Sequence, residues 1–270
     1  MSKHLRLRLR HRRRARRRSR ELVLFAALYL VYDAARWAWA GRPSVARAHA
    51  RCVIALERSL HIAVERPVQR ALGVGVPGFV LSNVYLVAQG VVLPVALIWL
   101  YRRSPEIYRR LRDTVVITWL IATPIFALYP VAPPRLAGIG ITDTVSHHAV
   151  LSLTGPSTLF YNPYAAVPSL HVGLAFAIGI AAAAALRRRW ARALPLLWGP
   201  LVTVAVIATG NHYIFDVGAG VLVAALAFTL TRLVEHVRVR RLRPPAASHA
   251  SPAVTVRHGA PEAVTGGAQP

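Results

Sequence analysis

The chain has few acidic residues, a single lysine and a single cysteine, and each shortage excludes a class of protein. Only 10 of its 270 residues are Asp or Glu, against 34 that are Arg or Lys. Cys52 alone excludes an internal disulfide and a thiolate cluster for zinc or iron–sulfur. Charged residues make up 16% and hydrophobic residues 55% of the chain, whereas soluble domains are about 25% charged. The composition therefore excludes an ordinary soluble domain and indicates an integral membrane protein.

Two tails flank a central apolar region. Residues 1–20 contain Lys3 and ten arginines without an acidic residue. This pattern predicts a basic cytoplasmic tail that binds anionic lipid rather than nucleic acid. Residues 244–270 are rich in Pro, Ala, Ser and Gly without periodicity, which predicts a disordered cytoplasmic tail. Residues 21–243 remain as one membrane domain.

Six apolar windows in this domain approach the roughly 20 residues that a helix needs to cross a bilayer. They are Leu22–Ala40, Phe79–Tyr101, Thr114–Val131, Ala166–Leu186, Leu194–Gly210 and Tyr213–Leu233. We therefore predict an all-α integral membrane fold, a bundle of six transmembrane helices. The first window has an alternative interpretation, because Leu22–Tyr32 followed by Ala38-Trp39-Ala40 also resembles a signal peptide with its cleavage site.

Arginines distinguish the connections between these windows. One arginine-rich loop follows Tyr101, another follows Leu186, and a third basic segment begins at Arg232. The positive-inside rule places these segments and both termini in the cytoplasm. The long segment Ala132–Ala165 has Arg135 as its only Arg or Lys. We expect it outside the cell, as part of a multi-pass protein of the plasma membrane with an extracytoplasmic active site.

The stretch Ser44–Leu72 has an amphipathic pattern. Its apolar residues are Val45, Ala48, Cys52, Ala55, Leu56 and Leu60, and its charged ones include Arg47, Arg51, Arg58 and Glu65. The spacing of three to four residues predicts a helix lying in the outer membrane interface after the first span. A solvated helix without lipid contact is the alternative.

Two polar motifs lie on the predicted outer side. His212 and Asp216 are four residues apart, so they share a helix face on which the carboxylate can orient the imidazole as a base or nucleophile. A structural pair that caps the last helix is the alternative. Pro168-Ser169-Leu170-His171 is typical of a helix N-terminus, which favours an anion. Ser169 then either caps the helix or contacts the anion, and His171 points into the same space.

Arg135 is a candidate phosphate ligand. It follows two prolines that fix the backbone, and its planar guanidinium suits phosphate oxygens. Anchoring of a lipid head group is the alternative. Residues that either line the pocket or act as interface aromatics and turn formers are Tyr129, Asn162 and Tyr164.

Metal binding is a competing hypothesis, in which His171, His212 and Asp216 form a facial triad. No spacing in the chain is a recognised metal signature. His147 and His148 have no third ligand at a recognised spacing. We therefore predict neither a metal nor another cofactor.

Three blocks in this order resemble the type-2 phosphatidic acid phosphatase superfamily. They are Ala132-Pro133-Pro134-Arg135, Pro168-Ser169-Leu170-His171 and Asn211-His212 through Asp216. The likeness covers roughly Phe79 to Leu233. It is strongest to the branch that includes inositol phosphorylceramide synthases, because Leu170 stands where other members have glycine.

The resemblance implies metal-independent phosphoryl transfer on a membrane lipid phosphate. The family's histidine matching His212 forms a phosphohistidine, the aspartate matching Asp216 orients it, and the histidine matching His171 protonates the leaving oxygen. The residues expected at the phosphate are Arg135, Ser169, Leu170 and Asn211. Val206 replaces an arginine common six positions before the nucleophile, so Arg135 is expected to neutralise more of the phosphate charge.

Three functions remain open at this level. A lipid phosphatase transfers the phosphoryl group to water, and a synthase-like transferase moves a phosphorylated head group to a lipid alcohol. A non-catalytic lipid-binding scaffold on the same fold is the third, because fold alone does not fix function. The sequence predicts neither the lipid nor the oligomeric state.

Overall fold

A computed structural model describes residues 42–148 and 163–242, together with residues 21, 23, 25–32, 34 and 35. The regular elements of this part are helices, and Val131 and Ala165 form an isolated β-bridge. Four helical segments are long and apolar enough to cross a membrane, namely Gly75–Arg103, Pro105–Leu128, Arg189–Ala208 and Ile214–Arg240. The prediction of an all-helical, multi-pass membrane protein is confirmed. The first predicted span, Leu22–Ala40, lies partly outside the described residues, and the number of six spans stays a prediction.

The helices of the bundle follow the apolar windows with shifted ends. They are α4 (Gly75–Val87), the π-helical turn η1 (Ala88–Val92), α5 (Leu93–Arg103), α6 (Pro105–Leu128), α8 (Leu170–Ala185), α9 (Arg189–Leu196), α10 (Trp198–Ala208) and α11 (Ile214–Leu242). Pro94 accounts for the π-helical turn, because proline has no N–H to offer the carbonyl of Gly90 four residues earlier. The apolar α8 has only 16 residues, but it contacts α5, α6, α9, α10 and α11 and so lies at the centre of the bundle.

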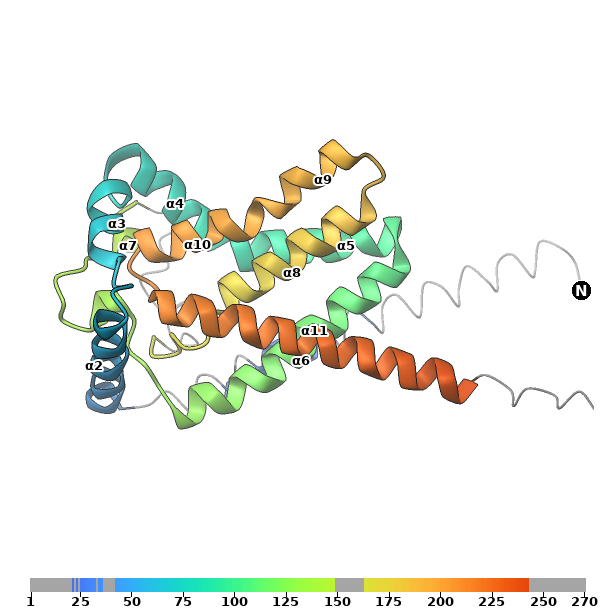
Figure 1. Ribbon diagram of the computed structural model, residues 1–270, viewed down its shortest axis with the longest axis horizontal. Helices are drawn as coiled ribbons and strands as arrows, with labels where there is room; N and C mark the ends of the chain where they lie inside the picture. Colours follow the sequence, from blue (N-terminus) through green and yellow to red (C-terminus); the bar gives the residue numbers. More distant parts are fainter. Residues whose placement is uncertain are drawn as a thin grey trace, which may run out of the picture.

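The connections that carry clustered arginines lie together at one end of the bundle (Figure 1). The α5–α6 connection, the α8–α9 connection and the end of α11 lie at one end, and α2, α3 and α7 lie at the other. Arg102 and Arg103 belong to the first of these connections, and Arg187 and Arg188 belong to the second. The fold therefore gathers the arginine-rich loops at one end, as the topology prediction requires.

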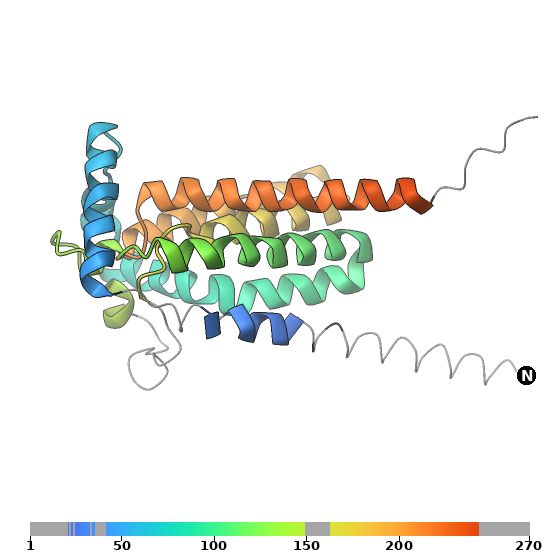
Figure 2. The ribbon, with the colours of Figure 1, turned by 90° about the horizontal axis from the view of Figure 1, so that it is seen from below.

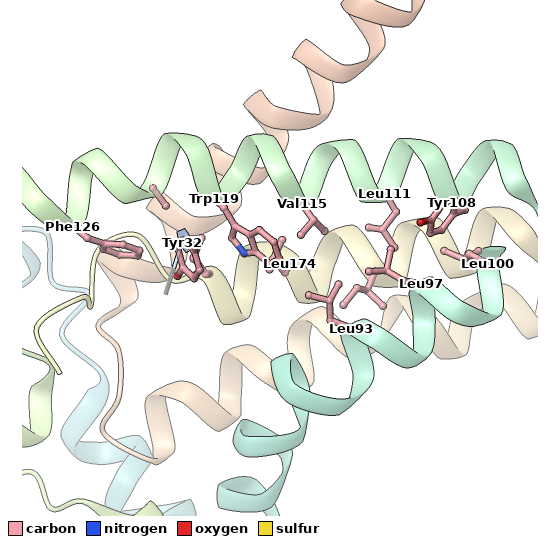
Figure 3. Packing of buried hydrophobic residues seen from close by; sticks show 13 residues of the cluster. Tyr32, Leu93, Leu97, Leu100, Tyr108, Leu111, Val115, Trp119, Phe126 and Leu174 are labelled. Atoms are coloured by element: carbon pink, nitrogen blue, oxygen red, sulfur yellow. The ribbon is translucent and has the colours of Figure 1, made fainter. Parts of the chain in front are cut away.

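A hydrophobic core holds α5, α6 and α8 together. Figure 3 shows Leu93 and Leu97 of α5 facing the row of α6 side chains that includes Val115 and Trp119. The ring of Tyr32 stacks on Trp119 with 5.4 Å between ring centroids. This contact packs the helical residues 25–32 against α6.

The predicted amphipathic helix Ser44–Leu72 is two helices, so that prediction was wrong in its continuity. α2 spans Pro43–Ser59 and α3 spans Glu65–Leu72. The chain turns between them, where His61 has a positive φ of 58°. Pro67 gives the physical reason, because proline is tolerated in the first turn of α3 but cannot continue a helix that started upstream.

α2 lies across the end of the bundle, at a steep angle to the long helices (Figure 2). Its buried residues are Ala46, Ala50, Val53, Ile54 and Glu57. Three residues of the predicted apolar stripe, Val45, Leu56 and Leu60, are instead exposed. α2 therefore packs an apolar face with one acid against the protein and turns the predicted apolar stripe outward.

α3 forms hydrogen bonds with the connection between the 3-10 turn η2 (Pro134–Leu136) and α7 (Thr144–His148). The Arg66 side chain donates to the Ile139 carbonyl at 2.7 Å. The Gln69 amide donates to the Thr142 carbonyl and accepts from the Thr142 N–H, both at 2.9 Å. These bonds close the end of the bundle where the predicted site lies.

Candidate active site

A pocket at this end of the bundle brings together residues from three distant parts of the chain. Arg135, His171 and His212 line it, and so do Leu170 and Asn211. The three sequence blocks that predicted a site therefore meet in space, each contributing at least one polar side chain. Figure 1 shows the reason, since the starts of α8 and α11 lie at the same end as α7, and η2 belongs to the connection that leads to α7.

His212 and Asp216 are in contact, as their spacing predicted. The Nδ1 atom of His212 lies 3.3 Å from the Oδ2 atom of Asp216 and 3.0 Å from the Ala166 carbonyl oxygen. Both neighbours of Nδ1 are acceptors, so Nδ1 carries the ring proton and donates it. In the neutral imidazole the lone pair is then on Nε2. Asp216 is fully buried and His212 is 6% exposed, so solvent does not compete for this bond.

Two glycines allow α8 and α11 to approach closely beside this pair. A Cβ atom added at Gly220 would lie 2.1 Å from the Ser169 carbonyl oxygen, and one added at Gly173 would lie 2.4 Å from the Gly220 carbonyl oxygen. The Ser169 N–H also donates to the Asp216 carbonyl at 3.0 Å. The backbone contact between the helices therefore sets how near the start of α8 comes to the His212–Asp216 pair.

His171 lies in the first turn of α8, which begins at Leu170 where the sequence predicted a helix N-terminus. Its ring centroid is 6.0 Å from that of His212. On its other side the ring stacks on Tyr85 of α4, with 4.4 Å between centroids and 23° between planes. Tyr85 thus limits how the His171 ring can turn within the pocket.

Arg135 is held at the pocket by both backbone and side-chain bonds. Its N–H donates to the Gly210 carbonyl at 3.0 Å, and its guanidinium donates to the Asn211 side-chain carbonyl and lies 3.4 Å from the Asp143 carboxylate. The Asn211 amide nitrogen in turn donates to the Thr209 hydroxyl at 2.8 Å. The side chain of Asn211, predicted to bind phosphate, therefore orients Arg135 through its oxygen.

The other predicted site residues lie differently. Ser169 is fully buried, and its hydroxyl makes neither a cap bond nor another hydrogen bond within the described residues. Tyr129 is 37% exposed and stacks on His49, and the Tyr164 carbonyl accepts from the Val131 N–H. Asn162 lies outside the described residues.

The metal hypothesis gains no geometric support. Within the ranges that the structure describes, no three His, Cys, Asp or Glu side chains are grouped as a metal site would require. The Oδ2 atom of Asp216 instead accepts from the Tyr213 N–H at 2.9 Å and faces the His212 ring.

Several residues at or behind the pocket were not predicted from the sequence. Tyr85 and Gln89 line it from α4 and η1, and Asp143 pairs with Arg135. Glu57 and Glu65 are buried behind the start of α11. The position of Glu57 could have indicated its burial, because it follows Val53 and Ile54 at helical spacing on the face that α2 buries and not on the charged face.

Comparison with known proteins agrees with this geometry. The family model described as the PAP2 superfamily matches residues 51–230, which include all three blocks of the pocket. Searches of curated proteins and of solved structures gave no match. Because the matched range covers well over half of the chain, we conclude that this protein belongs to the PAP2 superfamily.

Proposed function

We propose that this protein is a membrane enzyme that cleaves or transfers a phosphate ester of a lipid through a phosphohistidine on His212. The observation that carries the proposal is the buried contact between His212 and Asp216. His212 lines a pocket together with His171 and Arg135. Membership of the PAP2 superfamily supports phosphoester chemistry.

The first half-reaction forms the covalent intermediate. The Nε2 atom of His212 attacks phosphorus, and the bond from phosphorus to the lipid oxygen breaks. The Nδ1 proton stays between Asp216 and the Ala166 carbonyl, where the carboxylate stabilises the positive charge that develops on the ring. His171 donates a proton to the departing oxygen, so that the leaving group departs as a neutral alcohol.

The second half-reaction restores the enzyme. An incoming water or alcohol loses its proton to His171 and attacks phosphorus, and the phosphorus–nitrogen bond to His212 breaks. Arg135 stabilises the equatorial phosphate oxygens in both steps, since a guanidinium forms paired, charge-assisted bonds with them. Asp143 neutralises part of the charge of Arg135, so a bound phosphate competes with Asp143 for the guanidinium.

We further propose that the site faces the extracytoplasmic side of the plasma membrane in a six-span bundle. The gathering of arginine-rich loops at the end opposite the pocket supports this orientation, because such loops are retained in the cytoplasm. α2 then lies in the outer interface, with exposed Val45, Leu56 and Leu60 directed toward lipid.

A head-group transferase similar to inositol phosphorylceramide synthases is a second candidate. The observation that favours it is Leu170, which lines the pocket directly beside His171. An apolar side chain there offers no hydrogen bond to a water near the general base, and it offers an apolar contact to the hydrocarbon part of a lipid alcohol.

A substrate panel tests both candidates. Detergent-purified protein is incubated with radiolabelled lipid phosphates, with and without lipid alcohols, in the presence of a chelator. We expect release or transfer of labelled phosphate by the wild type and none by His212→Ala. Product that appears only with an alcohol identifies the transferase, and equal activity in both proteins would refute the phosphohistidine mechanism. No turnover of any substrate would instead favour a lipid-binding scaffold.

A further inference from the structure

Three carboxylates from three elements accept hydrogen bonds from the N–H groups at the start of α11 and of the residue before it. The Tyr213 N–H donates to Asp216 at 2.9 Å, the Ile214 N–H donates to Glu65 at 3.1 Å, and the Phe215 N–H donates to Glu57 at 2.7 Å. A helix start leaves such N–H groups without an intrahelical partner, and one side chain near the cap often satisfies one of them. Here two of the three acceptors come from α3 and α2, far away in the sequence.

Both distant carboxylates are deeply buried. Glu57 is 1% and Glu65 is 4% exposed, and neither forms an ion pair with a basic side chain in the part of the chain that the structure describes. Such burial is rare for an unpaired acid. Each is oriented toward the turn that carries the catalytic pair, since Phe215 directly precedes Asp216 and Ile214 follows His212 by two residues. A cap made only by residues next to this turn in the sequence would leave the turn free to fray.

We propose that Glu57 and Glu65 are positioning residues of this active site, which fix the first turn of α11 and thereby the contact between Asp216 and His212. The inference rests on the proposed function of His212 as the nucleophile. It gives α2 and α3 a role in the reaction, although neither helix contributes a side chain to the described pocket lining.

The charges around Glu57 indicate how the cluster is tolerated. Burial raises the pKa of Glu57 to about 8, and the nearby carboxylates of Glu65 and Asp216 add to this effect. The Phe215 N–H acts in the opposite direction. A neutral Glu57 accepts from Phe215 with one oxygen and has a proton to share with Glu65, so three negative charges do not meet in one buried space. Glutamine has the same shape and offers an acceptor and a donor.

The test uses the full-length protein in detergent with Glu57→Ala and Glu57→Gln. Glu235→Ala is the matched control, because Glu235 lies on α11, at the end opposite the turn that Glu57 holds, and pairs with Arg110. Hydrolysis of phosphatidic acid and of para-nitrophenyl phosphate is measured below the unfolding temperature of each variant. Hydrogen exchange of the peptide 212–218 is measured on the same samples.

We expect Glu57→Ala to lower kcat by about tenfold or more at nearly unchanged KM, because small displacements at a reacting centre cost up to about 10²-fold per Å. Amide exchange in 212–218 should rise in the same variant. Glu57→Gln should restore both readouts to near the wild-type values, and Glu235→Ala should change neither. A general loss of stability alone would not be rescued in this local manner.

Two results would overturn the inference. One is wild-type exchange in 212–218 together with wild-type kcat in Glu57→Ala, and the other is a Glu57→Gln variant as impaired as Glu57→Ala. If Glu57→Ala does not fold, Glu57→Asp, which is one methylene shorter, is subject to the same criteria. If His212→Ala retains the wild-type rate, the proposed function fails instead. If neither substrate is turned over, the exchange measurement alone decides.

Discussion

Gly220→Ala is the substitution whose effect the structure fixes most directly. A Cβ atom at this position would lie 2.1 Å from the carbonyl oxygen and 2.9 Å from the carbonyl carbon of Ser169. Both are backbone atoms, so no side-chain rotation relieves the overlap. Restoring ordinary van der Waals contact requires α8 and α11 to separate by about 1 Å.

The expected loss follows from that displacement. Overpacking of this kind costs about 1–3 kcal/mol, which in a domain of this size lowers Tm by about 2–12 °C. The effect on catalysis is larger, because His171 on α8 and His212 before α11 move apart, and a misplacement of about 1 Å reduces the rate by roughly 10²-fold. We therefore expect activity to fall far more than stability.

Gly218→Ala provides the matched control on the same helix. A Cβ atom at Gly218 meets no atom within 4 Å, and alanine has the higher helix propensity by about 1 kcal/mol. Its Tm is expected at or above that of the wild type, with unchanged activity. Thermal unfolding in detergent and turnover of the best substrate of the lipid panel measure both variants. A Gly220→Ala protein with wild-type Tm and wild-type turnover would refute the argument that backbone contact between α8 and α11 sets the site.

Four further predictions address charge, chemistry and topology. Arg135→Lys should lower turnover severalfold although the charge is kept, because lysine cannot form the paired bonds of a guanidinium; full activity in Arg135→Ala would exclude this role. His171→Ala should slow alkyl phosphate esters far more than aryl phosphates, whose leaving oxygens need little protonation, and equal slowing in a rate comparison would contradict the acid role. In a cysteine-free background, an impermeant thiol reagent on intact cells should label Ser146→Cys but not Arg188→Cys, and the reverse pattern would invert the topology. Glu57→Gln should gain stability relative to the wild type as pH rises from 4.5 to about 8. The unfolded wild type releases the Glu57 proton near pH 4.5 while the folded wild type keeps it, which lowers the stability of the wild type by about 1.4 kcal/mol per pH unit. A Tm difference between the two proteins that does not change with pH would contradict the raised pKa.

The sequence determined the membrane class and the general location of the site. Long apolar windows broken by arginine clusters indicate membrane helices, because a bilayer selects for length and charge placement that are both visible in one dimension. The His212–Asp216 contact was predictable for the same reason, since a spacing of four residues places side chains on one helix face wherever the helix lies. The start of α8 after Ser169 also followed from local signals.

Only the tertiary structure decided which distant groups meet. Glu57 lies on the buried face of α2 and reaches the Phe215 N–H across 158 residues of sequence. Neither Gly173 nor Gly220 shows by itself that it marks a contact between two backbones, because the partner is defined by helix packing rather than by neighbouring residues. The sequence specifies the chemical groups of this site. Packing between α8, α11, α2 and α3 specifies the distances between those groups, because the distances depend on contacts between segments far apart in the chain.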